Sequence, residues 1–178
     1  MRYLTASIIL AGCALSLSDG GHALAAPPEA NARASIAGID GNNVSGSLEF
    51  KSTPEGVHIT GTINGLAPNG RNGFHVHENG DCSAPEAKSA GGHFNPGDNA
   101  HGHPKSMPHH AGDIPNLDAN AMGTAVVDVT MDGVNLGTGH ESILNRAVIV
   151  HGKADDYATQ PAGDSGPRIA CGVISSRK

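Results

Sequence analysis

The sequence predicts an all-β domain, an antiparallel sandwich or barrel, on three observations. Glycine supplies 25 of the 178 residues, well above its ordinary share of about 7%, which favours many turns over long helices. Several short segments alternate apolar and polar residues with a period of two, as half-buried strands do. The chain offers no convincing amphipathic helix, and its length suits one domain with a proper core better than two.

The predicted strands cover residues 44–50, 57–63 and 125–131, and turn signals separate them. In the second, Val57, Ile59 and Ile63 share one face while Thr60 and Thr62 share the other. Glycine, proline and asparagine at residues 40–43, 53–56, 68–70 and 132–133 mark the turns. Because the chain has no tryptophan and few aromatics, the core must rest on valine, isoleucine, leucine and alanine.

Two long segments break this pattern. Residues 94–120 show no periodicity and hold four histidines, and residues 152–167 are rich in glycine, proline and aspartate. A loop of the first length is uncommon inside a compact domain unless it serves a function. We therefore expect something other than an apolar core to order both loops.

The segment GFHVH at residues 73–77 raises the first question of chemistry. In a strand, Phe74 and Val76 face one way, into the core, and His75 and His77 face the other, about 6 to 7 Å apart. That spacing lets two imidazoles converge on one metal ion, but histidine on an exposed strand face is also common. His58, between Val57 and Ile59, illustrates the second case.

Further histidines favour the metal interpretation. His93, His101, His110 and Asp113 follow in the sequence, and three histidines with one carboxylate are a common tetrahedral set for zinc. His103 and His109 lie close by, so spacing alone leaves open which loop histidines coordinate. The apolar run 147–150 ends at His151, where the second loop begins.

The N-terminus reads as an export signal. Arg2, an apolar run at 3–17 and small residues at 23–25 predict a signal peptide over residues 1–25, cleaved before Ala26, with a disordered lead-in at 26–31 and a domain at 32–178. The apolar run is too short to span a membrane. A competing interpretation is a lipobox at 10–13, which would place a lipid anchor on Cys13. Either predicts export to the periplasm or the cell exterior.

Charge and cysteine content fit this location. The net charge of −6, without a run of lysine or arginine, argues against a nucleic-acid partner. Removing the signal leaves Cys82 and Cys171, and an even pair in an oxidising compartment is most simply a disulfide.

Five segments together resemble the copper/zinc superoxide dismutase family, and the resemblance covers about residues 32–174. They are GFHVHENGD at 73–81, GGHFNP at 91–96, HAGD at 110–113, VIVHGKADD at 148–156 and GPRIACGVI at 166–174. The resemblance implies an eight-stranded antiparallel Greek-key β-barrel or sandwich with two long functional loops. It implies a copper site formed by His75, His77, His93 and His151, and a zinc site formed by His93, His101, His110 and Asp113.

The family pattern implies roles for other residues as well. His93 would bridge the two metals and act in catalysis, and Arg168 would be the active-site arginine. Asp155 would hydrogen-bond ligands of both metals, and Cys82 and Cys171 would form the family's disulfide. The implied reaction converts superoxide to oxygen and hydrogen peroxide as copper cycles between Cu(II) and Cu(I).

Two further expectations concern assembly and alternatives. Cys82 directly after Asp81, together with GGHFNP, resembles the bacterial, periplasmic branch, whose members are homodimers or monomers. The rival functions are a non-catalytic periplasmic copper- and zinc-binding protein on the same fold and a purely structural sandwich. Intact ligand positions and Arg168 favour the enzyme.

Overall fold

The computed structural model describes residues 31–177. The predicted signal peptide, Cys13 and residues 26–30 of the predicted lead-in lie outside the described residues. Asn31, the last residue assigned to that lead-in, is the first residue of β1. Within residues 31–177, no helix combines the length and the apolar character needed to cross a membrane.

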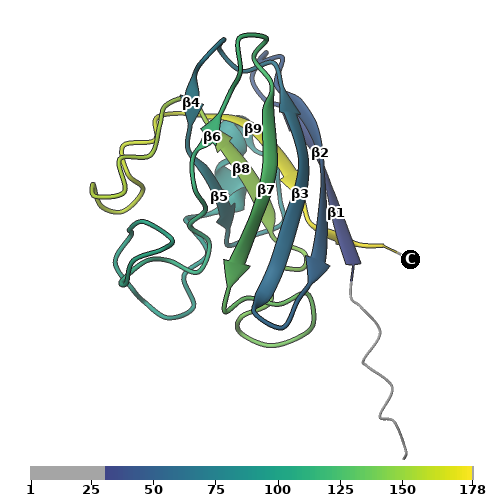
Figure 1. The fold of residues 1–178 in the computed structure, drawn as a ribbon, viewed down its shortest axis with the longest axis vertical. Helices are drawn as coiled ribbons and strands as arrows, with labels where there is room; N and C mark the ends of the chain where they lie inside the picture. The colour runs from purple at the N-terminus through teal and green to yellow at the C-terminus, as the bar shows by residue number, and fades with distance from the viewer. Residues whose placement is uncertain (1–30, 178) are drawn as a thin grey trace, which may run out of the picture.

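One curled antiparallel sheet makes up most of the fold (Figure 1). Its strands lie in the spatial order β5-β8-β9-β1-β2-β3-β7, and β10 pairs with β1. Their bounds are β1 Asn31–Gly38, β2 Ser45–Ser52, β3 Gly56–Asn64, β5 Phe74–His77, β7 Ala125–Asp132, β8 Ala147–His151, β9 Arg168–Val173 and β10 Ser175–Ser176. A two-stranded sheet pairs β4 Arg71–Asn72 with β6 Leu117–Asp118.

The connections follow a Greek-key path. β1, β2 and β3 form a meander, but the chain then crosses to β5 at the opposite end of the sheet. It returns to pair β7 with β3 and crosses again to β8, the neighbour of β5. The loop predicted at 94–120 lies on the crossover from β5 to β7, whereas the loop predicted at 152–167 joins the neighbouring strands β8 and β9. The prediction of an all-β, antiparallel fold is confirmed.

The alternating strands bury one face each. Leu48 and Phe50 of β2 and Ile59 and Ile63 of β3 are at most 1% exposed, and all four belong to the main hydrophobic core. β5 and β8 differ, because every residue in them is buried. Loops or a short helix cover the faces of these two strands that point away from the main core.

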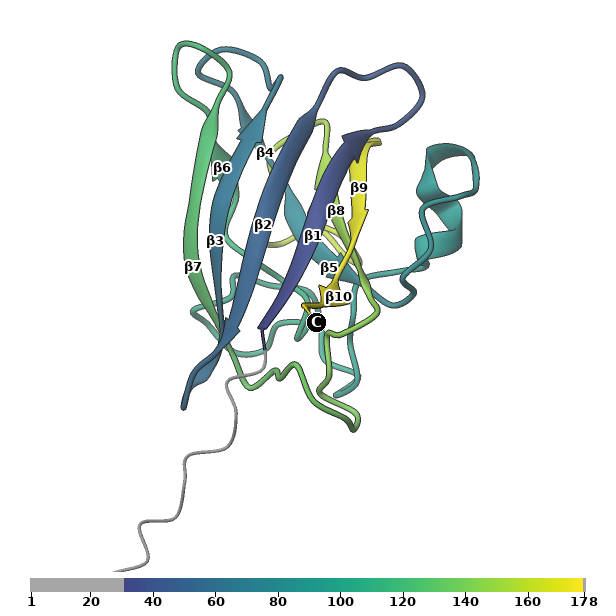
Figure 2. The same ribbon diagram turned by 90° about the vertical axis from the view of Figure 1, so that its right-hand side faces the viewer.

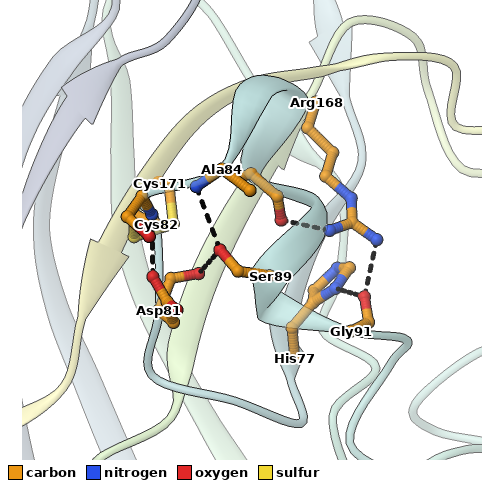
Figure 3. Close-up of a disulfide and its surroundings, with 10 residues drawn as sticks. His77, Asp81, Cys82, Ala84, Ser89, Gly91, Arg168 and Cys171 are labelled. Atoms are coloured by element: carbon orange, nitrogen blue, oxygen red, sulfur yellow. Dashed lines mark hydrogen bonds between the residues drawn. A yellow bond between two sulfur atoms is a disulfide. The ribbon is translucent and has the colours of Figure 1, made fainter.

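The short 3-10 helix η1, Pro85–Ala90, was not expected from the sequence, and Figure 2 shows it standing beside the sheet. Its buried Ala87 and Ala90 pack with Ile149 of β8 and Cys171 of β9 in a second, smaller core. The Cys82–Cys171 disulfide joins the same two regions, with the Cα atoms 5.9 Å apart (Figure 3). The segment before His93 is thereby attached to the last long strand.

Candidate metal centre

The strands deliver three of the predicted copper ligands. His75 and His77 lie on β5, and His151 ends β8, the strand paired with β5. Phe74 and Val76 point into the main core, as the alternation predicts. The two histidines of β5 therefore face away from that core.

The fourth predicted copper ligand, His93, lies on the long loop. This loop forms backbone hydrogen bonds with the free edge of β5 and so extends the ladder. The Phe94 amide donates to the Val76 carbonyl at 2.8 Å, and the Val76 amide donates to the Gly112 carbonyl at 2.9 Å. These bonds set His93 opposite His77 and Asp113 opposite His75. The backbone of the loop thus brings together residues that lie up to 38 positions apart in the sequence.

These four histidines form one buried group. Each can offer a ring nitrogen within 4.8 Å of those of the others, and none is more than 7% exposed. Four of the ring nitrogens lack a hydrogen-bond partner among the described residues, namely Nδ1 of His75 and Nε2 of His77, His93 and His151. Leaving buried polar atoms unpaired is costly, so their convergence indicates a site built for an ion.

The opposite ring nitrogens of three of them are occupied. His75 Nε2 lies 2.7 Å from Asp155 Oδ2, His77 Nδ1 donates to the Gly91 carbonyl at 3.0 Å, and His151 Nδ1 lies 3.3 Å from the Gly166 carbonyl. A hydrogen bond at one imidazole nitrogen selects the tautomer and orients the ring. These contacts leave the unpaired nitrogen of each ring free to bind a metal.

Burial disfavours the charged form of three of these histidines. It lowers the pKa of His77 well below the usual value, that of His93 to about 4 and that of His151 to about 3, with neighbouring histidines adding to the effect. Neutral imidazole is the form that binds a metal, so little proton competition remains at neutral pH. Imidazole suits copper, as it does zinc and several other transition metals.

A second group shares His93 and contains His101, His110 and Asp113. Asp113 Oδ1 lies 2.9 Å from His93 Nδ1 and 3.4 Å from His110 Nδ1. His101 Nδ1 lies 3.0 Å from Asp113 Oδ2 but is not aligned for a hydrogen bond, so proximity here reflects convergence of ligand atoms more than pairing. Three histidines and a carboxylate fit zinc.

Electrostatics in this group also favour a cation. Burial by itself would raise the pKa of Asp113, but the surrounding histidines hold it well below its usual range. Burial opposes the charged form of His101, yet the neighbouring carboxylates of Asp113 and Asp155 raise its pKa to about 9. The carboxylates thus bring negative charge into a buried site, where a divalent ion would balance it.

The structure separates the loop histidines that spacing left open. His101 and His110 join the group, whereas the His103 ring packs edge-on against Tyr157 with ring centres 4.5 Å apart. His109 Nδ1 donates to the His110 carbonyl. Neither His103 nor His109 belongs to either group of candidate ligands.

Asp155 connects the two groups. Its Oδ2 lies 2.7 Å from Nε2 of His75, and its Oδ1 lies 2.9 Å from Nε2 of His101. Asn116 fixes the Asp155 backbone from both sides, because its Oδ1 accepts from the Asp155 amide and its Nδ2 donates to the Asp155 carbonyl. The Tyr157 hydroxyl in turn accepts from the Asn116 amide at 2.7 Å. The role of Asp155 was predicted from the sequence, but the supporting roles of Asn116 and Tyr157 were not, because neither residue belongs to a recognisable motif.

Arg168, the first residue of β9, reaches over the four-histidine group. Its Nη1 donates to the Ala87 carbonyl and its Nη2 to the Gly91 carbonyl, each at 2.6 Å. Figure 3 shows that Gly91 accepts from both Arg168 and His77. The guanidinium is therefore fixed relative to a candidate ligand by a shared backbone oxygen, a contact that no sequence motif signals.

A cleft of about 400 Å³ opens above these groups. His77, His93 and His151 line it, together with Arg168 and the exposed Glu78 and Asp98. Arg168 is the permanent cation among the lining residues, since arginine stays protonated in proteins. The cleft can therefore admit a small anion and hold it at the guanidinium beside the histidines.

Comparisons with known proteins agree with this geometry. Residues 44–174 match the family model described as copper/zinc superoxide dismutase. The chain is 44% identical over 136 residues to superoxide dismutase-like protein YojM of Bacillus subtilis, covering 72% of this chain and 68% of that protein. It is 42% identical over 135 residues to superoxide dismutase [Cu-Zn] 2 of Aquifex aeolicus, covering 74% of this chain and 79% of that protein.

A solved structure supports the same relationship. The crystal structure of a SOD-like protein from Bacillus subtilis superposes with a TM-score of 0.73 at 40% sequence identity, covering 79% of this chain and 96% of that chain. Family match, sequence identity and fold therefore lead to one conclusion. The chain belongs to the copper/zinc superoxide dismutase family.

Proposed function

We propose that the protein is a superoxide dismutase, which converts two superoxide anions and two protons into oxygen and hydrogen peroxide. One observation carries the proposal: four buried histidines direct unpaired ring nitrogens to one point, beside a cleft that holds a fixed arginine. His75, His77, His93 and His151 would hold copper. His93, His101, His110 and Asp113 would hold zinc.

Each residue has a task in this reaction. Bound copper supplies one-electron exchange between Cu(II) and Cu(I). Arg168 uses two N–H groups on backbone carbonyls and keeps others to bind the superoxide anion. His93 Nε2 would hold a proton only while it is not bound to copper and could then deliver it to the reduced oxygen, and Asp155 keeps the rings of His75 and His101 in place.

The attraction of an anion needs a local cause, because the chain carries a net charge of −6. Arg168 and histidines of both candidate metal groups line the cleft, and bound divalent ions would add positive charge there, whereas carboxylates elsewhere on the surface are screened over about 8 Å at physiological salt. The local field can therefore favour superoxide despite the overall charge.

A second function has an observation in its favour. The similarity to a protein named superoxide dismutase-like supports a non-catalytic protein that binds copper and zinc on the same fold. Arg168 and the complete set of histidines favour the enzyme, since a metal buffer needs no anion-binding group in the cleft.

Metal analysis paired with a superoxide-consumption assay separates the two. We expect one copper and one zinc per chain, and rapid superoxide consumption that disappears when copper is removed and returns when it is restored. Both metals bound at these ratios without consumption would instead establish the non-catalytic protein.

We further propose that the protein is exported to the periplasm, with a homodimer or a monomer as its assembled state. The intramolecular disulfide supports an oxidising compartment. Mass spectrometry of the mature protein tests the processing: a free N-terminus at Ala26 supports signal-peptide cleavage, and a lipid-modified Cys13 supports an anchor. Sedimentation of the metal-loaded protein tests the assembly.

A further inference from the structure

The second long loop holds the backbone of one candidate zinc ligand. The His101 amide donates to Gln160 Oε1 at 2.8 Å, and Gln160 Nε2 donates to the His101 carbonyl at 2.9 Å. Gln160 Nε2 also lies 3.3 Å from the Ala158 carbonyl within its own loop. A primary amide offers one acceptor and two donors, so a single side chain satisfies both backbone groups of a residue 59 positions away.

The same loop also fixes the ring of His101. Asp155 Oδ1 accepts at His101 Nε2, and Gly163 packs directly on this contact. At Gly163, φ is +65°, and a Cβ atom would lie 1.8 Å from Asp155 Oδ1 and 2.7 Å from His101 Nε2. Residues 155–163 therefore enclose His101 from its backbone and from its ring, leaving Nδ1 directed at the zinc group.

Gln160 adjoins the cleft as well. The next two residues, Pro161 and Ala162, line the cleft together with His151 and Arg168. A movement of His101 would therefore be transmitted through one side chain to the wall of the cleft. No ladder of β-strand hydrogen bonds joins these two loops within residues 31–177 to carry the connection instead.

We propose that Gln160 is a positioning residue that holds His101 for zinc and couples zinc occupancy to anion binding in the cleft. The inference deepens the proposed function, because it rests on the zinc group assigned there. Gln160 itself is exposed and belongs to neither group of candidate ligands; it contacts the zinc group through the backbone of His101. Its role is to act through His101 on one side and through Pro161 on the other.

Zinc affinity and site geometry test the first half. We expect Gln160→Ala to bind zinc about tenfold more weakly in competition with a chelator, the lower end of what loss of a ligand's hydrogen-bond partner costs. With Co(II) in place of zinc, its visible absorption bands should shift, because they report the ligand geometry. Gln160→Glu keeps the acceptor for the His101 amide but turns a carboxylate oxygen, which cannot donate, toward the His101 carbonyl, so it should also weaken zinc binding.

Thr159→Ala is the matched control. Thr159 is exposed in the same loop, and its hydroxyl donates to Asp156 without touching the other loop. It should keep the zinc affinity and the Co(II) spectrum of the unmodified protein. Unchanged affinity and spectrum in Gln160→Ala would overturn the positioning role, and if that variant does not fold, the same comparison uses Gln160→Glu.

Anion binding tests the coupling. Azide serves as the probe, titrated optically into copper-loaded protein with and without zinc. We expect zinc to tighten azide binding at least about fivefold in the unmodified protein, the lower range of coupling between sites, and less than about twofold in Gln160→Ala. An equal zinc effect in both proteins, or none in the unmodified protein, refutes the coupling.

These measurements involve no turnover, so the two proposals fail separately. If the Gln160 effects are observed but the protein consumes no superoxide, the positioning role stands and the proposed enzymatic function fails. If the protein consumes superoxide but Gln160→Ala behaves like Thr159→Ala, the proposed enzymatic function stands and the positioning role fails.

Discussion

Phe50 in the sheet and His93 in the long loop are both buried, at 1% and 7% exposure, but different contacts surround them. Phe50 lies among apolar side chains and between two hydrogen-bonded strands. His93 lies among histidines and a carboxylate, on a chain segment with only a few ladder bonds to β5. The sheet is ordered by apolar burial, whereas the loops combine a few core side chains, among them Phe94, Ile114 and Leu117, with polar groups around two candidate metal sites.

Because different contacts order them, the sheet and the loops should respond differently to substitution. Loss of apolar burial lowers the stability of the whole domain, since the core is continuous through the sheet. Loss of a polar partner in the loops should act mainly on metal binding, because that is where the unpaired atoms converge. The following variants separate the two responses.

The disulfide joins the two regions, so its removal should have the largest effect. It closes a segment with a sequence separation of 89, which the chain-entropy model values at roughly 4 to 5 kcal/mol. We expect the Cys82→Ser, Cys171→Ser double variant to lose about this much unfolding free energy, measured by denaturant titration. A loss below about 1 kcal/mol would show that packing of η1 on β8 and β9 holds the segment by itself.

A core truncation should affect stability alone. Phe50→Ala removes a nearly fully buried side chain, and such substitutions cost about 3 to 5 kcal/mol. Protein that remains folded should keep its copper and zinc content, measured by elemental analysis. Metal loss in the folded fraction would break the distinction between sheet and loops.

Arg168 links the sheet to the chemistry. Hydrogen bonds to charged groups contribute roughly 1.5 to 3 kcal/mol, so we expect Arg168→Ala to lower kcat/KM for superoxide by about 10- to 100-fold with both metals retained. Arg168→Lys keeps the charge but loses the planar guanidinium, so its kcat/KM should lie between those of Arg168→Ala and the unmodified protein. Unchanged rates in Arg168→Ala would remove its assigned role.

Asp155 tests the loops. Substitution of a hydrogen-bond partner of metal ligands typically weakens metal binding by about 10- to 100-fold, and we expect Asp155→Asn to weaken zinc and copper binding within this range. Thermal unfolding of the metal-free variant should change far less than that of Phe50→Ala. A large loss of metal-free stability would instead place Asp155 within the folding core.

His58 offers the matched case on the sheet surface. Its Nε2 lies 2.7 Å from Asp128 Oδ1, the same distance as in the pair formed by His75 and Asp155, but both side chains are at least 36% exposed. Exposed pairs contribute little, so His58→Ala should change unfolding free energy by less than about 0.5 kcal/mol and leave metal content unchanged. A measurable loss of metal would contradict the interpretation of His58 as an ordinary surface residue.

Much of the fold could be predicted because strand periodicity is a local property. Residues 44–50, 57–63 and 125–131 lie within β2, β3 and β7 apart from Val44, which precedes β2. η1 was missed, since its six residues combine a distorted backbone with only two buried side chains, both alanine. Ser175 and Ser176 form β10 because β1 presents a partner that the local sequence does not reveal.

The sequence by itself determined the residue types for a copper and zinc protein, the alternation that buries Phe74 and Val76, and the cysteine pair. Spacing left open which loop histidines join the zinc group and the family resemblance implied His101 and His110, and the tertiary structure brings these two, but not His103 or His109, together with His93 and Asp113. The tertiary structure alone shows that the Gly91 carbonyl accepts a hydrogen bond from Arg168 and that Gln160 hydrogen-bonds to the backbone of His101. The physical reason is that alternation and motifs record what each residue can do, whereas these contacts join backbone and side chains across 59 or more positions, where no local pattern constrains them.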